Sequence, residues 1–563
     1  MNTFRHASIC VVAALLSLCA TSAHSQDQAM WGRDFYTTFP ANELADYETS
    51  ASLTFELLIS ASIQTHVSIT QGQTKFALDT IIAANTTARV LLPSGVECQS
   101  TEVVESNKAI HITTDAAVQV VAISSKPMTS DAWVVYPTNI LGTSYRPLCF
   151  NASVNPMMFG TGLDHPSEFT VTATENNTQV TITPRTMTMA GTVGPLTYTL
   201  NAGDVVQIWG STADSSMDLT GSLISSDKPI AVLSGHRRTE CPSYYTFTDN
   251  SGALRTSRDF LCEQMPPITA WAKQALVIPL TANEPQTLVR VLSASDSNVI
   301  SVDGVNIGVI QAGQFVQIDS IGRSLIEGTG PILVGEYLHT ASGVNAQADP
   351  SLSIADRPPV VGGIHHLTAI TNPTGFTFIF STIIAKQSDV GSIMIDGAPI
   401  NPAAANPIGA TGYSFVRFSL SAGDHIVSAT APYTVSICGF GQVSSYAYTF
   451  PTSLFADPKL SVPTESAVID RFRIDRIAPN PVNSGNSIQA HVQSPAGTQL
   501  QWALYDAAGR NVSGGSTVTH GDGVLSVVLD AQLQNGIYLL RVNAFGSSGA
   551  VLHSSAEKII LAR

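Results

Sequence analysis

The chain has 563 residues, only 12% of which are charged, and its formal net charge is −15. An acidic chain without runs of basic residues is poorly suited to bind nucleic acid or an anionic membrane surface, so neither partner is expected. The length predicts several domains.

The first residues have the pattern of a secretory signal peptide. Arg5 gives the positive start, residues 11–18 form the apolar run, and Ala23-His24-Ser25 is a small-x-small cleavage site. We therefore expect cleavage after residue 25 and export of the remaining chain. The apolar run is too short to cross a bilayer and no later stretch is long enough, so no membrane span is expected.

A small-residue turn recurs at a constant interval in the first 450 residues. Its copies are Ala202-Gly203-Asp204, Ala312-Gly313-Gln314 and Ala422-Gly423-Asp424. A strand phrase led by proline keeps step with the turn, beginning at Pro229, Pro331 and Pro432. A degenerate earlier copy of the turn is expected at residues 84–86. Four related repeats are typical of a scaffold for display and binding, and less so of a single catalytic cleft.

Within one repeat, apolar residues alternate with Thr and Ser at the period of half-buried strands, and Asp-Gly pairs supply tight turns. We therefore predict an all-β chain of tandem antiparallel β-sandwich-like repeats. A closed, propeller-like arrangement of the four repeats is the alternative. The predicted divisions are a signal peptide at 1–25, repeats at 26–140, 141–270, 271–360 and 361–450, a linker at 451–471 and a C-terminal Ig-like β-sandwich at 472–563.

Five cysteines follow the predicted signal peptide, and an exported protein can form disulfides. Cys241 and Cys262 bracket one insertion, so we predict that they pair. Cys98 and Cys149 are the second candidate pair, with buried thiols as the alternative. An odd count leaves one thiol free or paired between chains.

Short motifs for catalysis or metal binding are absent from the sequence, including His-Glu-x-x-His and Gly-x-Ser-x-Gly. His365 and His366 are adjacent, so on a strand they point to opposite faces and do not share an ion. Asp204 and Asp424 are interpreted as turn residues rather than calcium ligands. We expect His236 to seat the loop between the cysteines through a hydrogen bond. No metal site, cofactor or enzymatic activity is predicted.

The phrase at residues 226–236, Ser-Asp-Lys-Pro-Ile-Ala-Val-Leu-Ser-Gly-His, is followed by the cysteine-bounded insertion, Glu-Gln-Met-Pro-Pro at residues 263–267 and Trp271. In this order the elements resemble the N-terminal domain family of IgGFc-binding protein, over about residues 30–450. The resemblance implies an extracellular binding or adhesion module whose ligand is a protein or a glycan. It supplies no motif for ligand contacts.

The insertion, residues 237–267, is the candidate contact surface, because functional loops extend from rigid β scaffolds. Tyr244 and Tyr245 on the insertion and Trp271 just beyond it are the candidate binding residues, since exposed aromatic side chains stack on sugars or anchor protein partners. The alternative is that these rings cover the edge of the core.

A second set of motifs lies near the C-terminus. In order, its residues are Pro479, Asn480, Pro481, Tyr505, Gly509, Arg510, Gly536, Tyr538 and Lys558. Together they resemble the C-terminal sorting domain of the type IX (Por) secretion system of Bacteroidetes-like bacteria. The resemblance implies recognition by that secretion machinery, and a protein that is released or attached to the outer cell surface.

Two other functions remain open from the sequence. The first is a secreted glycan-acting hydrolase, which would need two carboxylates in one cleft, a pair that the sequence does not reveal. The second is a self-associating structural protein of a surface matrix, for which the odd cysteine is the hint.

Overall fold

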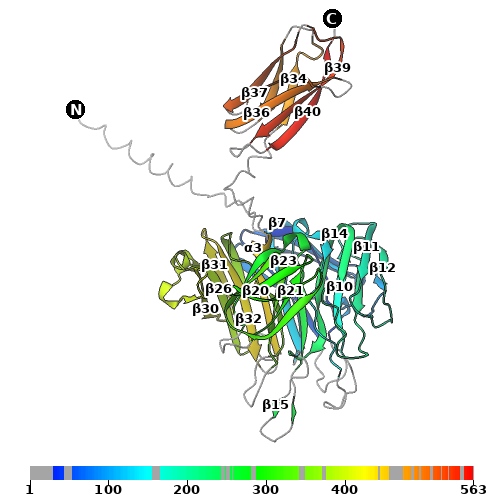
Figure 1. Cartoon of the computed structure of the whole chain (residues 1–563), viewed down its shortest axis with the longest axis vertical. Helices are drawn as coiled ribbons and strands as arrows, with labels where there is room; N and C mark the ends of the chain where they lie inside the picture. Colours follow the sequence, from blue (N-terminus) through cyan, green and yellow to red (C-terminus); the bar gives the residue numbers. More distant parts are fainter. Residues whose placement is uncertain are drawn as a thin grey trace, which may run out of the picture. The chain divides into compact units, whose positions relative to one another are not determined.

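A computed structural model describes residues 30–42, 53–127, 129–154, 165–242, 247–248, 254–255, 258–280, 287–340, 349–370, 376–441, 444–455, 473–482, 487–493, 496–506, 511–520, 523–530, 532–545 and 551–561. Almost all of its regular structure is β-strand (Figure 1). The chain divides into a larger unit, Gln26–Ser461, and a C-terminal unit that contains Val462–Arg563. Each unit is described by itself.

Four repeats of curled antiparallel β-sheet make up the larger unit; repeats 1 to 3 are one sheet each, and repeat 4 comprises two. Repeats 1 and 2 share one plan. A central strand pairs with a long strand, and the long strand also pairs with an outer hairpin and with an inner strand. Repeat 1 contains β1 (Gly32–Thr37), β2 (Thr54–Ala61), β3 (Thr65–Gln71), β4 (Phe76–Ile82), β5 (Thr86–Leu91), β7 (Ile110–Lys126) and β8 (Thr129–Val135). Repeat 2 contains β9 (Gly142–Tyr145), β10 (Ser167–Ala173), β11 (Thr178–Thr183), β12 (Leu196–Leu200), β13 (Val205–Trp209), β14 (Leu223–Thr239) and β17 (Asp259–Gln264), and β6 (Val104–Glu105) pairs with β13.

Repeat 3 follows the same plan, whereas repeat 4 divides its strands between two sheets. Repeat 3 contains β18 (Ala272–Val277), β19 (Thr287–Ser293), β20 (Asn298–Val302), β21 (Val305–Ile310), β22 (Phe315–Ile321), β23 (Ser324–Leu338) and β24 (Leu352–Ile354). Repeat 4 contains β25 (Gly363–Thr368), β26 (Phe378–Lys386), β27 (Met394–Ile395), β28 (Ala398–Pro399), β29 (Asn406–Pro407), β30 (Tyr413–Ser419), β31 (Asp424–Ala429), β32 (Tyr433–Gly441) and β33 (Ser444–Phe450), and a short helix α3 (Thr452–Phe455) follows it. Strands β15 (Phe247–Thr248) and β16 (Leu254–Arg255) form a separate hairpin.

The proline of the recurring phrase lies at the bend of the long strand in repeats 2 and 3 and at its break in repeat 4. Pro229 lies within β14 and Pro331 within β23, and the register of the partner strands β9 and β18 shifts beside them. Proline has no N–H for the ladder and is tolerated in sheets at edges and bulges. In repeat 4 the long strand is split into β31 and β32, and Pro432 lies in the break. In these repeats the proline lies where the long strand changes partners, and β7 of repeat 1 has a corresponding register shift against β1 without a proline.

The recurring turn is equivalent in repeats 1 to 3 but not in repeat 4. Asn85 (φ 57°), Gly203 (φ 85°) and Gly313 (φ 77°) each precede the strand that pairs with the central strand of the repeat, where a left-handed residue is needed. Gly423 instead lies between β30 and β31, at the start of the split long strand. The predicted third copy of the turn is therefore wrong, and the constant interval to it is a coincidence of loop lengths.

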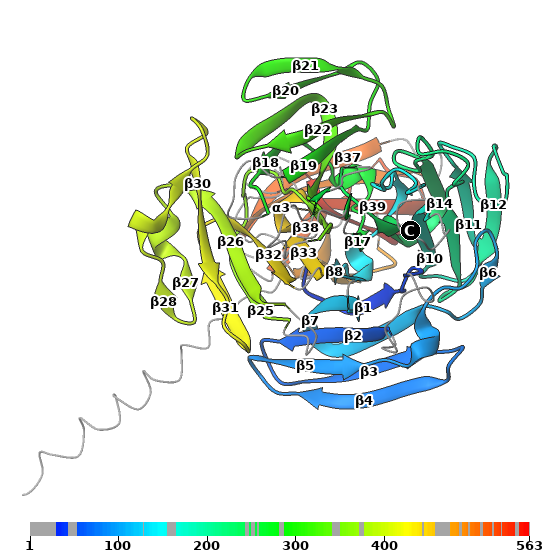
Figure 2. The same ribbon diagram turned by 90° about the horizontal axis from the view of Figure 1, so that it is seen from below.

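The four repeats surround a common centre, where β8, β17 and β33 lie innermost (Figure 2), and β24 contacts β17 and β33 there. The first and last repeats meet, since the Trp31 indole N–H donates a 2.9 Å hydrogen bond to the Ile364 carbonyl. The predicted all-β class of antiparallel repeats is confirmed. Their arrangement is the closed, propeller-like one that the sequence left as the alternative.

One carboxylate joins the innermost strands of all four repeats. Asp131, on β8, is fully buried and accepts hydrogen bonds from the Cys262 N–H (3.0 Å), the Ser351 hydroxyl (2.8 Å) and the Ala447 N–H (3.3 Å). These donors belong to repeats 2, 3 and 4. Next to it, the Asp259 carboxylate accepts from the backbone N–H groups of Ser130 and Ser445. Buried acids therefore hydrogen-bond the innermost strands to one another at the centre.

The C-terminal unit is a sandwich of two antiparallel sheets, as predicted, around a core of its own that includes Leu500, Leu540 and Ile559. One sheet is β34 (Arg473–Ala478), β35 (Ser487–Gln493) and β38 (Gly523–Val528). The other is β37 (Asn511–His520), β36 (Ala496–Tyr505), β39 (Gly536–Phe545) and β40 (Val551–Leu561).

We predict that the larger unit is more stable in mild acid than in mild base. Burial raises the pKa of Asp131 and Glu336 to about 8 and of Glu97 and Asp356 to about 7. Their unfolded values are about 4, so the folded state binds these protons more tightly. The resulting stability is present below about pH 4 and is lost as the pH rises through 7 to 8. Thermal melts should therefore give a lower Tm at pH 9 than at pH 5.5.

Glu336→Gln should reduce this pH dependence, because the amide keeps a carbonyl acceptor for the Ile278 N–H but does not titrate. Glu175→Gln, at an exposed turn, is the matched control and should leave the slope unchanged. A Tm that rises from pH 5.5 to pH 9 in the unaltered protein would contradict the prediction.

Candidate functional site

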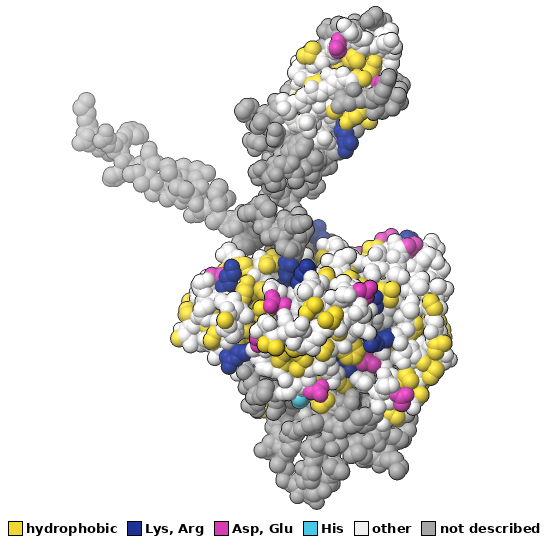
Figure 3. Space-filling view, viewed as in Figure 1, with side chains coloured by type: hydrophobic (Ala, Val, Ile, Leu, Met, Phe, Trp, Pro, Cys, Tyr) yellow, Lys and Arg dark blue, Asp and Glu magenta, His cyan; other side chains and the backbone are white. Residues whose placement is uncertain are grey.

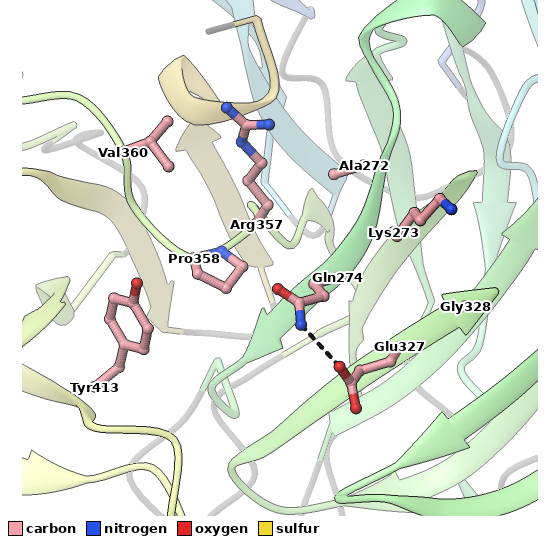
Figure 4. A pocket seen from close by; sticks show the side chains of 9 residues that line it. All are labelled: Ala272, Lys273, Gln274, Glu327, Gly328, Arg357, Pro358, Val360 and Tyr413. Atoms are coloured by element: carbon pink, nitrogen blue, oxygen red, sulfur yellow. Dashed lines mark hydrogen bonds between the residues drawn. The ribbon is translucent and has the colours of Figure 1, made fainter. Parts of the chain in front are cut away.

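A groove of about 510 Å³ lies at the boundary of repeats 3 and 4 (Figure 4). One wall comes from β18 and the first half of β23, and the other from β30, with the segment that leads from β24 to β25 between them. The lining residues are Ala272, Lys273, Gln274, Glu327, Gly328, Arg357, Pro358, Val360 and Tyr413. The volume is within the range of pockets that enclose small ligands.

The strand wall is set by the β18–β23 ladder. Gln274 lies directly opposite Glu327, and its side-chain N–H donates a 2.7 Å hydrogen bond to the Glu327 carboxylate. Such cross-strand pairs hold both side chains in one orientation. The neighbouring Lys273 is exposed, and no hydrogen bond or ion pair of its ammonium group occurs among the described residues. This wall therefore offers a fixed amide and carboxylate, whereas the Lys273 side chain extends away from them (Figure 4).

A buried acid, Asp356, holds the segment between β24 and β25 in place. The Asp356 carboxylate accepts hydrogen bonds from the backbone N–H groups of Arg357 (2.8 Å) and Ser453 (3.1 Å), and its own carbonyl accepts from the Leu276 N–H. The Val360 N–H donates to the Ser453 hydroxyl. Burial raises the pKa of Asp356 to about 7, although these bonds favour its charged form. The segment is thus a rigid floor for the groove.

Tyr413 forms the opposite wall (Figure 4). Its ring packs on the small apolar cluster between repeats 3 and 4, which includes Leu276, Ile278 and Phe415. Its hydroxyl has no hydrogen-bond partner among the described residues, although its backbone N–H donates to Thr411. A ring held at its base with a free hydroxyl can pack against an apolar face of a ligand and hydrogen-bond to its edge.

The groove differs in charge from the rest of the chain. Its lining has two cations, Lys273 and Arg357, and one anion, Glu327, whereas the chain as a whole carries −15. Charged side chains are sparse and scattered over the face of the larger unit that Figure 3 shows. Among the described residues, no group of three or more His, Cys, Asp or Glu side chains is placed to hold a metal ion. The groove is therefore suited to bind a polar ligand through side chains.

The residues predicted on the insertion do not form an exposed aromatic surface in the described part of the chain. Trp271 is only 6% exposed, packs in the core of repeat 2 and donates a hydrogen bond to the Pro266 carbonyl. Its predicted role as a binding residue is therefore wrong, and the alternative, a ring that covers the core, holds. Tyr244 and Tyr245 lie outside the described residues. His236 accepts a hydrogen bond from the Arg238 N–H at the start of the insertion, as expected.

The predicted disulfides are not formed, and all five cysteines of the described chain are buried free thiols. Gly235 on β14 lies opposite Cys262 on β17, so Cys241 is displaced along the ladder by six residues from the position that faces Cys262. The two side chains also belong to different apolar clusters. Cys98 and Cys149 lie in separate clusters as well. Sequence spacing did not reveal the strand register that separates these thiols.

Several residues of the second resemblance come together in the C-terminal unit. The Asn480 side chain accepts a hydrogen bond from the Ile560 N–H, and Gly536 and Tyr538 pair with Leu561 and Ile559. The other described members are Pro479 and Pro481 beside Asn480, Tyr505 at the end of β36, and Lys558 on β40. Gly509 and Arg510 lie outside the described residues. The motifs thus join the final strands of the sandwich.

The fold is an all-β scaffold of four repeats with a groove between repeats 3 and 4, and comparison with known proteins places it in a family. The family model described as IgGFc binding protein matches residues 131–439, more than half of the chain, and the chain belongs to this family. The human IgGFc-binding protein is 24% identical over 452 residues, which cover 76% of this chain but only 8% of that protein. The family resemblance predicted from the sequence is confirmed.

The similarity to solved structures supports no conclusion about the fold or the function of this chain. A β-glucuronidase from Ruminococcus gnavus has 11% identity and a TM-score of 0.12, with 51% of this chain and 34% of that chain covered. The enzyme from Parabacteroides merdae has 10% identity and a TM-score of 0.13, with 36% and 29% covered. Scores of this size indicate neither a shared fold nor a shared activity. Among the described residues, no helix is long and apolar enough to span a membrane.

The groove residues were not predicted from the sequence. They come from four separate segments of two repeats, and none belongs to a recurring phrase. Asp-Gly pairs and prolines predict turns and bends within one sheet. They do not predict which side chains meet between neighbouring sheets. Only the pairing of β18 with β23 brings Gln274 to Glu327.

We predict that the five thiols of the described chain are unreactive in the folded protein. Burial raises the pKa of Cys438 to about 12 and that of the other four well above the usual range, so alkylation of the native protein should be slow. Denaturation without reductant should then expose five alkylation sites by mass spectrometry. Fewer than five, restored by prior reduction, would show that a disulfide had formed.

Proposed function

We propose that this protein is an extracellular binding or adhesion protein that holds a protein or glycan ligand in the groove between repeats 3 and 4. The observation that carries the proposal is that every residue lining the groove lies inside the region matched by the family model. The groove joins side chains of two repeats on a rigid β scaffold, which is the usual place for recognition. The relative's name makes the Fc region of IgG one ligand to test.

The protein acts by binding and without chemical turnover in this proposal. A single carboxylate, Glu327, lines the groove, whereas glycoside hydrolysis ordinarily uses two. A self-associating matrix protein linked by disulfides is also disfavoured, since the five thiols of the described chain are buried.

The proposed route to the cell exterior uses both ends of the chain. The signal-like start would direct export from the cytoplasm, and the C-terminal sandwich would engage the type IX secretion machinery. Support for the second step is the gathering of Asn480, Gly536 and Tyr538 against the last strand. The protein would then be secreted or attached to the outer surface.

We predict that filling the groove abolishes ligand binding. Ala272→Trp places a large ring among the lining residues, and Ala77→Trp, on exposed β4 of repeat 1, is the matched control. Both variants and the unaltered protein would be tested on immobilised mucins, glycans, IgG Fc and matrix proteins, with thermal melts to verify folding. Saturable binding should be lost with Ala272→Trp and kept with Ala77→Trp.

Binding that survives Ala272→Trp in a folded protein would remove the groove from the proposal. An absence of saturable binding by the unaltered protein to every surface would contradict the binding function itself.

A further inference from the structure

Repeat 4 contains a second site, in which a serine, a histidine and an aspartate are joined by hydrogen bonds. The Ser421 hydroxyl lies 3.2 Å from Nε2 of His425, and Nδ1 of the same ring lies 2.8 Å from the Asp396 carboxylate. Contacts in this order, from hydroxyl to imidazole to carboxylate, activate serine nucleophiles. Tyr413 of the groove begins β30, whereas Ser421 follows the end of that strand. The site is therefore separate from the groove, and a reaction there goes beyond the proposed binding function.

The aspartate is held by the strands around it. Asp396 begins an Asp-Gly turn between β27 and β28, on the outside of repeat 4 (Figure 2). Its Oδ1 accepts a 2.8 Å hydrogen bond from the Ile426 N–H, which leaves Oδ2 for the His425 ring. Although partial burial opposes it, hydrogen bonds from His425 and Ile426 hold the pKa of Asp396 below its usual value. Asp396 is therefore an ionised carboxylate near neutral pH.

This carboxylate selects the tautomer of the histidine. An ionised carboxylate only accepts hydrogen bonds, so the proton of the neutral His425 ring lies on Nδ1 and Nε2 keeps its lone pair. Nε2 can therefore accept the proton of the Ser421 hydroxyl. The Ser421 carbonyl oxygen, also 3.2 Å from Nε2, can accept a hydrogen bond once the ring carries both protons. The pair is thus arranged for proton transfer in both directions.

The loop after the serine is fixed and presents free donors. The Gly423 carbonyl accepts from the Ala369 N–H (3.2 Å), and the Asp424 carboxylate accepts from the Thr368 hydroxyl (2.7 Å). The N–H groups of Ala422 and Gly423 are exposed and donate no hydrogen bond among the described residues. Backbone N–H groups beside a serine nucleophile can stabilise the oxyanion of acyl transfer.

An exposed aromatic ring lies at the same end of the sheet as the serine. Strand β26 begins at Phe378 and is antiparallel to β30, and the Leu420 N–H donates to the Ile379 carbonyl at this end. The Phe378 side chain is 48% exposed and packs on the Phe440 ring, with 5.4 Å between ring centroids. A small apolar acyl group bound at Ser421 can cover this ring.

Charge disfavours acidic substrates at this site. Asp396 and Asp424 flank the serine loop, and the chain as a whole carries −15, so an anionic ester would be repelled. We propose that Ser421, His425 and Asp396 form a catalytic triad that hydrolyses neutral esters of small apolar acids.

The reaction proceeds in two steps. Ser421 Oγ attacks the ester carbonyl carbon and its proton passes to Nε2 of His425, after which the bond to the alcohol breaks and the imidazolium gives that proton to the leaving oxygen. Water then attacks the acyl-serine and gives a proton to Nε2. The acid leaves as the imidazolium returns this proton to Ser421 Oγ, so that ester and water give acid and alcohol.

The test uses the full mature chain and p-nitrophenyl butyrate. Hydrolysis should exceed that in buffer and should fall in acid, where a histidine base is protonated. Ser421→Ala and His425→Ala should each lower kcat/KM about 100-fold. The matched controls are Ser388→Ala, at another exposed serine of repeat 4, and His66→Ala, at an exposed histidine beside a carboxylate; neither should change the rate. The p-nitrophenyl ester of succinic acid, which keeps a free carboxylate, should be the poorer substrate.

Asp396→Asn tests the positioning role of the aspartate. The amide keeps an acceptor for the Ile426 N–H, but its NH₂ group would donate to Nδ1 and so move the ring proton to Nε2, which could no longer accept from Ser421. We expect kcat to fall at least about tenfold with KM and Tm almost unchanged. A change in Tm alone would show a structural role and contradict the assignment.

A fluorophosphonate, which phosphonylates activated serines with release of fluoride, gives a readout that needs no variant. Peptide mass spectrometry should find the label on Ser421. Hydrolysis no faster than in buffer, equal rates for Ser421→Ala and Ser388→Ala in folded proteins, or a label on another serine alone would overturn the proposal. Faster hydrolysis of the succinate ester than of the butyrate would overturn the substrate class.

Discussion

The Asp131 carboxylate is the interaction on which the closed arrangement depends. A single side chain accepts hydrogen bonds from three other repeats, so their innermost strands are held to the first one at one point. Loss of this acceptor would leave buried N–H groups, such as that of Cys262, without a partner, which costs about 1–3 kcal/mol for each group. Apolar side chains could fill the same centre, but they would not fix the four strands in one register.

The plan of the repeats was accessible from the sequence because bends and turns have local causes. A proline that removes an N–H from the ladder and a residue at positive φ can be identified from a few neighbouring residues. Gly423 shows where this reasoning fails. It satisfies a turn as well as Gly203 does, so spacing alone could not show that it lies in a different connection.

The candidate site was not accessible in the same way, because its residues meet only through tertiary structure. Whether Trp271 is exposed depends on the packing of repeat 2, and whether Cys241 meets Cys262 depends on the β14–β17 register. The chemistry of the groove depends likewise on Tyr413 of repeat 4 facing Gln274 of repeat 3. The sequence therefore identified the family and the scaffold, while the insertion at residues 237–267 stays a predicted contact surface, since Tyr244 and Tyr245 lie outside the described residues.

The position of the groove between two repeats has a consequence for cooperativity. Since its walls belong to different sheets, a ligand that contacts both binds only when repeats 3 and 4 are docked. By mass action, such a ligand favours the docked state over any state in which the ring has opened. Because the ring closes through Trp31 and Ile364, far from the groove, this coupling would extend to the junction of the first and last repeats. Binding of the proposed ligand and closure of the ring of four repeats would therefore be thermodynamically coupled.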